Sequence, residues 1–319
     1  MVHLPFWIRN KSGVAFSDFP ERLGGRMPDF CIIGAAKCGT TALNRMLSQQ
    51  PSFYMSPIKE PHYFSTEFML EKGQDWYRGL FSEAEPYQVC GESSTSYTRY
   101  PIVEGTAARM ADANPDMKLI YIMREPVSRT ESETLQTMKY AKNVLGEDHS
   151  TMPLDDFFYM IEEPNHPYYS AIFETSCYIK QIEAFMEYFE AENMLLLLQE
   201  DLKSSTISVL ERVANFLGVD PTTLIESNVS RNVTSDWIGG LERERAATGF
   251  SNLPFYNALK PFVSLKLKTR LLKIAGNRTN LSGDLRFSLK LREELREKFR
   301  CPNRRLRARL ETVPENWWL

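Results

Sequence analysis

Two segments of the sequence combine cationic and hydroxyl side chains in a pattern that suits the binding of phosphate-like anions. The first runs from Gly34 to Thr41 and reads Gly-Ala-Ala-Lys-Cys-Gly-Thr-Thr. It follows a short apolar stretch and precedes an amphipathic one, so we expect a strand, a loop of small residues and a helix. The loop N–H groups and the positive end of the helix favour an anion at the same place. Lys37 adds a full positive charge, and Thr40 and Thr41 add hydroxyl donors.

The position of the lysine distinguishes this loop from that of the nucleoside triphosphatases. Their loop reads G-x-x-x-x-G-K-[ST], with the lysine directly after the second glycine. Here Thr40 takes that place, and Lys37 lies two residues before Gly39. The pattern therefore favours an anion other than a magnesium-bound triphosphate. The alternative is an ordinary strand-turn-helix corner with a lysine on its surface.

The second segment begins with Arg124, at the end of the apolar run Leu119–Met123. In open α/β sheets ligands bind at the carboxyl ends of strands, where an arginine can make a forked contact with a phosphate. If a helix spans Val127–Lys139, Ser132 lies about two turns beyond Arg124 and can face the same pocket. The alternative is a salt bridge at the end of the strand between Arg124 and Glu125 or another acidic residue.

A third group of reactive residues, Lys59, Glu60 and His62, lies within four positions in an otherwise aromatic stretch. Pro57 and Pro61 exclude a helix there, so we expect a short strand and a rigid loop. A carboxylate or imidazole in apolar surroundings can have its pKa moved toward neutrality, as a general base requires. The alternative is a solvated Lys59–Glu60 pair beside a structural histidine.

Three strand-helix units position these groups. Their strands are expected at 30–33, 119–123 and 194–198, each followed by a helical pattern. Such repetition predicts an α/β protein with a three-layer, P-loop-like fold, in which helices flank a central parallel sheet. We expect residues 1–27 to be a lead-in and residues 28–319 to form a single domain. Further helices are expected at 107–113, 154–161, 178–189, 208–217 and 285–300.

The composition excludes several functional classes. With 43% hydrophobic and 25% charged residues, the chain reads as a soluble globular protein. A net charge of −3 argues against a general nucleic-acid binder, so we expect no nucleic-acid partner. No apolar run of about 18 residues is present, and we therefore expect no transmembrane segment.

The cysteines and sequons bear on compartment. The cysteines are scattered without a CxxC pair, which argues against a zinc cluster and a dense disulfide framework; they are Cys31, Cys38, Cys90, Cys177 and Cys301. N-x-[ST] sequons, which point toward a secretory lumen, occur at Asn10, Asn228, Asn232, Asn277 and Asn280. The start of the chain does not read as a signal peptide. We expect a cytoplasmic protein, with the Golgi lumen as the alternative if an N-terminal anchor was removed.

Taken together, these motifs resemble the sulfotransferases that use 3′-phosphoadenosine 5′-phosphosulfate (PAPS), especially the heparan sulfate sulfotransferases and their bacterial relatives. The segment 34–41 resembles the 5′-phosphosulfate loop of that family, and the segment 124–132 resembles its 3′-phosphate motif. The segment Lys-Glu-Pro-His-Tyr-Phe at 59–64 resembles the loop that carries its catalytic glutamate. The resemblance extends over residues 28–318.

The resemblance implies a role for each matching residue. The residues that would hold the 5′-phosphosulfate are Lys37, Cys38, Gly39, Thr40 and Thr41. Arg124 and Ser132 would bind the 3′-phosphate, with Arg278 in a basic loop that covers it. Glu60 would act as general base, with His62 as helper or substitute. Lys37 would also stabilise the charge that develops on the departing nucleotide. PAPS would be the donor and 3′-phosphoadenosine 5′-phosphate (PAP) the product, with no metal required.

Two other functional classes stay open at this point. One is a P-loop nucleotide kinase or other phosphoryl transferase, and the other is a non-catalytic nucleotide-binding protein. The sequence also departs from glycan-modifying sulfotransferases, because Ser93 or Ser94 stands near the place where those enzymes often carry a lysine. We expect a carbohydrate or small-molecule hydroxyl, or an amine, as acceptor. The sequence does not determine the oligomeric state.

Overall fold

The fold was analysed in a computed structural model, which describes residues 24–141, 147, 149, 152–163, 166–225, 285–309 and 317. These residues belong to two compact units. Unit 1 contains those up to Arg129, those from Ser170 to Arg231, and those from Lys298 onward. Unit 2 contains the described residues within Thr130–Tyr169 and within Asn232–Glu297. The assignment of residues 28–319 to a single domain stays a prediction.

Unit 1 is built on a parallel sheet of five strands, ordered β2-β3-β1-β4-β5. The strands are β1 (Phe30–Gly34), β2 (Phe53–Met55), β3 (Val89–Ser93), β4 (Lys118–Met123) and β5 (Met194–Leu198). The central strand β1 is buried along its whole length. Because helices cover both faces of such a sheet, its strands read as apolar runs rather than as alternating patterns.

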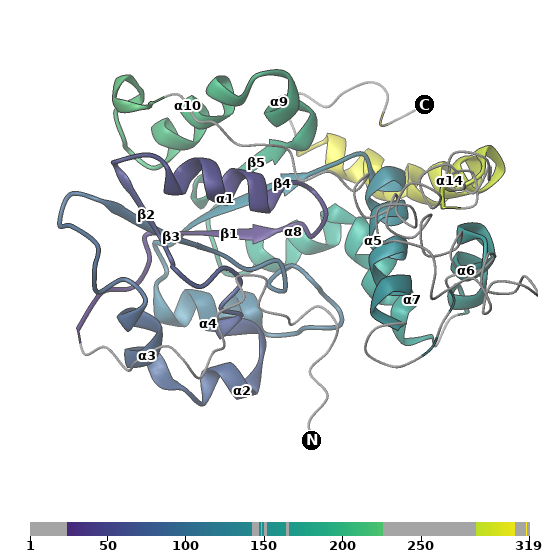
Figure 1. Cartoon of the computed structure of the whole chain (residues 1–319), viewed down its shortest axis with the longest axis horizontal. Helices are drawn as coiled ribbons and strands as arrows, with labels where there is room; N and C mark the ends of the chain where they lie inside the picture. Colours follow the sequence, from purple (N-terminus) through teal and green to yellow (C-terminus); the bar gives the residue numbers. More distant parts are fainter. Residues whose placement is uncertain are drawn as a thin grey trace, which may run out of the picture. The chain divides into compact units, whose positions relative to one another are not determined.

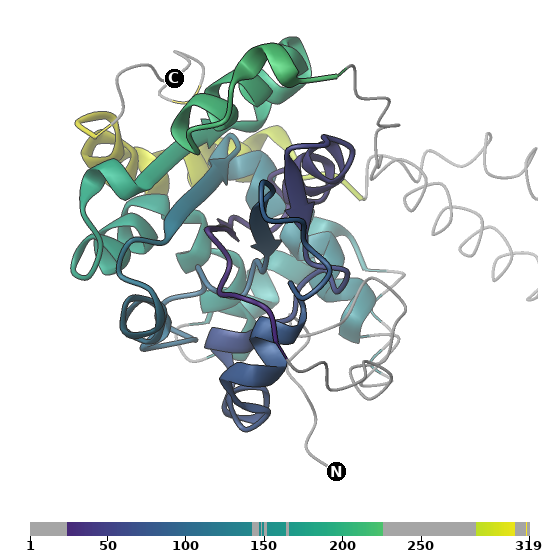
Figure 2. The same ribbon diagram turned by 90° about the vertical axis from the view of Figure 1, so that its left-hand side faces the viewer.

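Helices form the two outer layers of unit 1. Figure 1 shows α1 (Thr40–Ser48), α9 (Gln199–Ser204) and α10 (Thr206–Phe216) on one side of the sheet. The helices α4 (Thr106–Ala113) and α8 (Tyr178–Met186) lie on the other side, and Figure 2 gives the view from the side of β2. Right-handed crossovers explain this division, because the chain leaves β1 toward one edge of the sheet and returns toward the other.

The remaining elements are shorter or have residues in both units. They are η2 (Tyr63–Ser65), α2 (Glu67–Leu70), α3 (Gly73–Gly79), α5 (Pro126–Tyr140), α6 (Leu154–Ile161), α7 (Pro167–Ile172), η4 (Glu174–Ser176), η5 (Ala191–Asn193), η6 (Pro221–Thr223) and α14 (Leu289–Arg307). The predicted three-layer α/β architecture with a central parallel sheet is confirmed. No helix within the described ranges is long and apolar enough to cross a bilayer.

Unit 2 shows why one predicted helix begins late. The helix expected from residue 285 starts at Leu289. Ahead of it, the Glu131 carboxylate accepts hydrogen bonds from Arg286 at 2.8 Å, from the Phe287 N–H at 3.0 Å and from Arg292 at 2.6 Å. The Phe287 ring also packs on Phe158, with centroids 5.4 Å apart. These contacts hold the chain in a turn and a bend at residues 285–286, and α14 begins after them.

The strand order places the predicted anion site. The connection from β1 leads to β2 at one edge, and the connection from the neighbouring β4 leads to β5 at the other edge. A crevice opens where adjacent strands send their connections in opposite directions, and α/β proteins bind ligands there. The loop of Lys37 follows β1, and Arg124 follows β4, so both predicted anion-binding segments begin at this point.

Candidate active site

The loop after β1 is shaped by residues in left-handed backbone conformations. Gly34 has a φ of 154°, Lys37 of 69° and Gly39 of 102°. A β-carbon at Gly34 would lie 2.0 Å from Thr98 Oγ1, so a side chain is excluded at the start of the loop. Only glycine adopts such angles freely, so Gly34 and Gly39 allow the chain to turn sharply from β1 into α1. Lys37 adopts the same kind of angle at a conformational cost.

The start of α1 fits an anion. Gly39 caps the helix without a side-chain hydrogen bond, and the first turn carries no acidic residue. First-turn N–H groups lack partners within a helix, and their partial positive charges favour an anion there. Thr40 is buried, whereas Thr41 and Lys37 are half-buried. The start of α1 is therefore compatible with a bound anion, and the roles of Lys37, Cys38, Gly39, Thr40 and Thr41 toward the 5′-phosphosulfate stay predictions.

Arg129 is hydrogen-bonded to this loop. Its guanidinium is buried and donates to the Ala36 carbonyl at 3.2 Å. It also donates to the Ile172 carbonyl at 3.0 Å and to Ser176 Oγ at 2.7 Å. These bonds fix one loop carbonyl and hold it to the segment ahead of α8. Nothing in the sequence distinguished Arg129 from an exposed arginine on α5.

Tyr178 connects the two anion-binding segments. Its hydroxyl donates to the Arg124 carbonyl at 2.7 Å and accepts from the Arg124 N–H at 3.3 Å. The same oxygen lies 3.4 Å from Cys38 Sγ in the first loop. Burial raises the pKa of the Cys38 thiol to about 11, so this thiol is neutral. The sequence indicated Tyr178 only as an apolar position of a helix.

Glu125 caps α5 immediately after Arg124. Its carboxylate accepts from the Val127 N–H at 3.0 Å and from the Ser128 N–H at 2.7 Å. The acidic neighbour of Arg124 is thus engaged with the start of the helix, which is the role that an N-terminal carboxylate fills best. This arrangement leaves the half-buried Arg124 side chain at the carboxyl end of β4.

Two other predicted phosphate ligands have different outcomes. Ser132 lies on α5, about two turns after Arg124 along the chain, and is 6% exposed. Ser132 belongs to unit 2 and Arg124 to unit 1. Arg278 lies outside the described residues. The phosphate-binding roles of all three residues stay predictions.

The predicted base lies in a buried cluster. Glu60 is 1% exposed and His62 is fully buried. Lys59 Nζ lies 2.9 Å from Glu60 Oε1, His62 Nε2 lies 3.6 Å from Glu60 Oε2, and Thr95 Oγ1 donates to Glu60 Oε1 at 3.4 Å. The Lys59–Glu60 pair is therefore not a solvated surface pair. The Lys59 ammonium and the His62 imidazole fix the orientation of the Glu60 carboxylate, and its role as general base stays a prediction.

The end of β3 holds the base segment in place. The Glu60 N–H donates to the Ser93 carbonyl at 3.0 Å, and the His62 N–H donates to Ser94 Oγ at 3.1 Å. His62 Nδ1 lies 2.7 Å from Ser96 Oγ. The Ser93 carbonyl and the Ser94 and Ser96 hydroxyls thus fix the segment that carries Glu60.

Left-handed backbone angles mark the predicted catalytic residues. Among the described residues, the non-glycine positions with positive φ are Lys37 at 69°, Glu60 at 61° and His62 at 56°. This conformation is uncommon for residues with a β-carbon, and it is retained mainly where the surroundings enforce it, often at active sites. The angles are an independent structural feature shared by the three residues that the sequence assigned to the reaction.

Glu92 is a buried carboxyl that sequence reasoning did not identify as a candidate. It lies on β3 with no exposed surface, and burial raises its pKa to about 7. The signal that was available is a glutamate inside a strand whose neighbours are apolar or hydroxyl-bearing. Such a residue is almost never fully buried unless its partners are provided.

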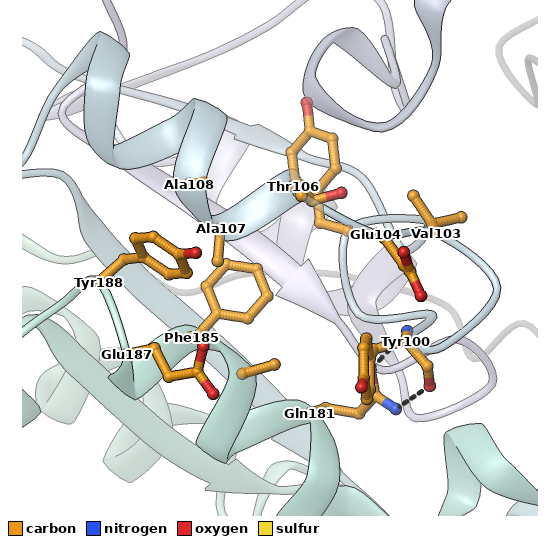
Figure 3. Close-up of a pocket in the computed structure, with 13 residues that line it drawn as sticks. Tyr100, Val103, Glu104, Thr106, Ala107, Ala108, Gln181, Phe185, Glu187 and Tyr188 are labelled. Carbon is orange, nitrogen blue, oxygen red and sulfur yellow. Dashed lines mark hydrogen bonds between the residues drawn. The ribbon is translucent and has the colours of Figure 1, made fainter.

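A cavity of about 270 Å³ lies between α4 and α8 on the other face of the sheet. Figure 3 shows Phe185 and Tyr188 on one side of it, and Tyr100 joined to Gln181 on another. The Gln181 amide donates to the Tyr100 carbonyl at 2.6 Å. Among the described residues, those that line the cavity include two glutamates and no lysine or arginine. Its charge is therefore unsuited to a phosphate-bearing nucleotide, and it is distinct from the site described above.

Comparison with known proteins agrees with this geometry. Residues 27–239 match the model of the sulfotransferase domain family. The chain is 29% identical to mouse heparan sulfate glucosamine 3-O-sulfotransferase 5, over 61% of this chain and 55% of that protein. It is 30% identical to human heparan sulfate glucosamine 3-O-sulfotransferase 3B1, over 61% of this chain and 47% of that protein. The chain thus spans about half the length of the curated relatives that it matches.

A solved structure gives the same assignment. The crystal structure of a sulfotransferase from Alicyclobacillus acidocaldarius is 29% identical, with a TM-score of 0.53. The match covers 79% of this chain and all of the bacterial one. The family match spans the anion loop, the base segment and the arginine after β4. The chain belongs to the PAPS-dependent sulfotransferase family.

Proposed function

We propose that this protein transfers a sulfuryl group from PAPS to an acceptor hydroxyl or amine, with Glu60 as general base. The observation that carries this proposal is the shared left-handed conformation of Lys37, Glu60 and His62. Each angle costs conformational energy, and such strain clusters at active sites. The family resemblance and the backbone geometry therefore point independently to the same three residues.

The donor would be held at both of its anionic ends. The N–H groups at the start of α1, with Lys37, Thr40 and Thr41, would bind the 5′-phosphosulfate. Arg124 and Ser132 would bind the 3′-phosphate, as the family resemblance implies. The capped α5 and the Tyr178 bridge support this assignment, because they fix the backbone on which Arg124 sits.

The reaction would be an in-line displacement at sulfur. The acceptor gives its proton to the Glu60 carboxylate as its oxygen or nitrogen forms a bond to sulfur. The bond from sulfur to the 5′-phosphate oxygen breaks, and PAP departs with the electron pair. Lys37 would stabilise the negative charge that grows on this oxygen, which is the role of a preorganised cation in group transfer. His62, 3.6 Å from Glu60, would orient the carboxylate.

We propose a carbohydrate or small-molecule hydroxyl as the acceptor. The support is the names of the curated relatives, which are heparan sulfate glucosamine 3-O-sulfotransferases. The competing proposals of a P-loop kinase and a non-catalytic nucleotide-binding protein are less well supported. The lysine of the anion loop precedes the second glycine, unlike that of the triphosphatases. A buried carboxylate beside an imidazole, as in Glu60 and His62, also favours an enzyme over a protein that only binds.

The direct test is calorimetric titration with PAP and with ATP, each with and without magnesium. We expect PAP to bind without magnesium and ATP to bind weakly or not at all. A preference for ATP with magnesium would support the kinase instead. Transfer is then measured with radiolabelled PAPS against a panel of saccharide and small hydroxyl acceptors, in which the catalytic proposal requires a sulfated product.

A further inference from the structure

Glu92 is a buried carboxyl that the proposed reaction does not use. It lies at the end of β3, with no exposed surface. Tyr77 donates a hydrogen bond to its Oε1 at 3.2 Å, and Ser94 donates to its Oε2 at 2.9 Å. The hydroxyl of Tyr97 is a third hydrogen-bond partner. A buried carboxyl with three hydroxyl donors is a built site rather than an accident of packing.

The hydroxyl of Ser94 also contacts the segment that carries the predicted base. Ser94 Oγ donates a hydrogen bond to Glu92 and also accepts one from the His62 N–H at 3.1 Å. His62 is one of the left-handed residues, with a φ of 56°. A hydroxyl whose proton is committed to a carboxylate presents its lone pairs to that N–H. Glu92 thereby orients the group that holds the strained His62 backbone.

The two tyrosines contact the residues that follow His62. The Tyr77 ring stacks on Tyr63 with centroids 4.4 Å apart, and it meets Phe64 edge to face at 5.1 Å. Tyr97 packs against Phe64 at 5.8 Å, and its hydroxyl lies 3.5 Å from the Phe64 N–H. All three partners of Glu92 therefore contact the segment 62–64.

From this geometry we infer that Glu92 is a positioning residue, whose ionised carboxylate gathers the hydroxyls of Tyr77, Ser94 and Tyr97 and so holds the Glu60–His62 segment in its working conformation. The inference rests on the proposed function for its catalytic consequence, but not for its structural one. An ionised carboxylate accepts from all three hydroxyls. A protonated one must donate with one oxygen, so that one hydroxyl has to turn away or lose its bond.

The groups around Glu92 determine its response to pH. Burial raises the pKa of Glu92 to about 7, and the hydrogen bonds from Tyr97, Ser94 and Tyr77 and the charge of Lys59 act in the opposite direction. The surrounding acids are Cys31, Tyr77 and Tyr97, and burial raises the pKa of each well above its ordinary value. These three stay protonated near neutrality. The hub formed by Glu92 and the three hydroxyls is therefore complete above pH 7 and incomplete below it.

Hydrogen exchange followed by mass spectrometry tests the structural part without any acceptor. Glu92→Gln keeps the size of the side chain but, like the protonated acid, offers one acceptor and one donor. At pH 8 we expect the peptide covering 60–66 to exchange about tenfold faster in this variant, since a bond to a charged group is lost. Peptides of β4 and α10 should be unchanged. Equal exchange in the 60–66 peptide would refute the inference.

Two further variants keep this test decisive. Ser94→Ala removes a single arm of the hub, and it should raise exchange at His62 even if the Glu92 variant folds poorly. Glu183→Gln makes the same chemical change at a carboxylate on α8 that pairs with Arg305. It should leave the 60–66 peptide as it is in the wild type. Faster exchange in the Glu183 control as well would show a general loosening and would also count against the hub.

The pH profile of transfer tests the catalytic part. We expect kcat of Glu92→Gln to match the wild type near pH 6 and to fall about tenfold below it at pH 8.5, with unchanged PAP affinity. A constant ratio across this range would overturn the inference while leaving the sulfotransferase proposal intact. A wild-type protein that binds no PAP would instead overturn the proposed function, and the exchange experiment would still test the hub.

Discussion

At the scale of single residues, the site depends on side chains whose backbone is held in an unfavourable conformation. The left-handed region costs a residue with a β-carbon about 1 kcal/mol or more. Lys37 and Glu60 both lie in it, at 69° and 61°. Glycine would be the less strained choice at either position. The presence of lysine and glutamate therefore indicates that their side chains are needed there.

Glu60→Gln tests the base directly. The amide keeps the shape of the side chain but cannot take a proton, so we expect kcat to fall by about 100-fold or more. PAP affinity should stay within about twofold, since Glu60 is not assigned to the donor. Radiolabelled transfer and calorimetry give the two values. Full activity would contradict the role of Glu60, and His62→Ala would be the next variant to measure.

Lys37→Gly separates stability from function at one position. Relief of the left-handed strain should leave the free energy of unfolding unchanged or raise it by up to about 1 kcal/mol. Loss of the charge should weaken PAP binding about tenfold or more. Lys72→Gly is the matched control, because Lys72 has a φ of −68° and should only lose stability. Denaturant unfolding and calorimetry report both quantities.

At the scale of elements, the anion site is held together by contacts between segments far apart in the sequence. Tyr178 reaches Cys38 across 140 positions and Arg124 across 54. Arg129 reaches Ala36 across 93 positions. Each contact joins a loop that follows one strand to a loop or helix start that follows another. The crevice at the carboxyl ends of β1 and β4 is thus a rigid frame rather than a pair of independent loops.

Tyr178→Phe tests this frame. The change removes one hydroxyl and keeps the packed ring, so the cost in stability should be about 1 kcal/mol. We expect a larger effect on PAP affinity, of about tenfold, because both anion-binding segments lose a shared support. Tyr188→Phe, at a tyrosine that is 51% exposed, is the control. Unchanged PAP affinity in Tyr178→Phe would mean that the two segments hold their places without the bridge.

The elements were predictable from the sequence, and these contacts were not. Strands β1 and β5 and the part of β4 from Leu119 to Met123 are apolar runs, and the helix that the sequence predicts at 154–161 has these bounds in the structure. Periodicity indicates which face of a helix is buried but not which partner it meets. Tyr178 was therefore recognised as a core position and not as a hydrogen-bond donor. Glu92 and Arg129 were missed because the side chains that satisfy them come from other elements.

At the scale of the whole molecule, stability should depend on pH through the buried Glu92. Its pKa is about 7 in the folded protein, against an ordinary value of 4.5. The folded state therefore binds this proton more tightly than the unfolded state does. The free energy of unfolding should fall as pH rises from about 4.5 to 7 and then level off. The full difference corresponds to a loss of about 3 kcal/mol.

Chemical denaturation at a series of pH values measures this dependence. The wild type should lose stability between pH 5 and pH 7, and Glu92→Gln should lose about 2 kcal/mol less over the same interval. The variant should consequently be the more stable protein at pH 8, although we expect it to be the slower enzyme there. Parallel curves for the two proteins would show that Glu92 titrates at its ordinary pKa.

The bridge through Tyr178 also has a consequence for selectivity. Because one hydroxyl ties the loop after β1 to the segment after β4, the separation between the two anion-binding positions is fixed in advance. On the proposed assignment, the crevice therefore selects nucleotides whose two phosphate groups have the matching separation. A molecule with only one of the two phosphate groups would leave one position empty and could not recover the loss by drawing the loops together. Adenosine 5′-monophosphate and adenosine 3′-monophosphate should each bind with much less than half of the binding free energy of PAP.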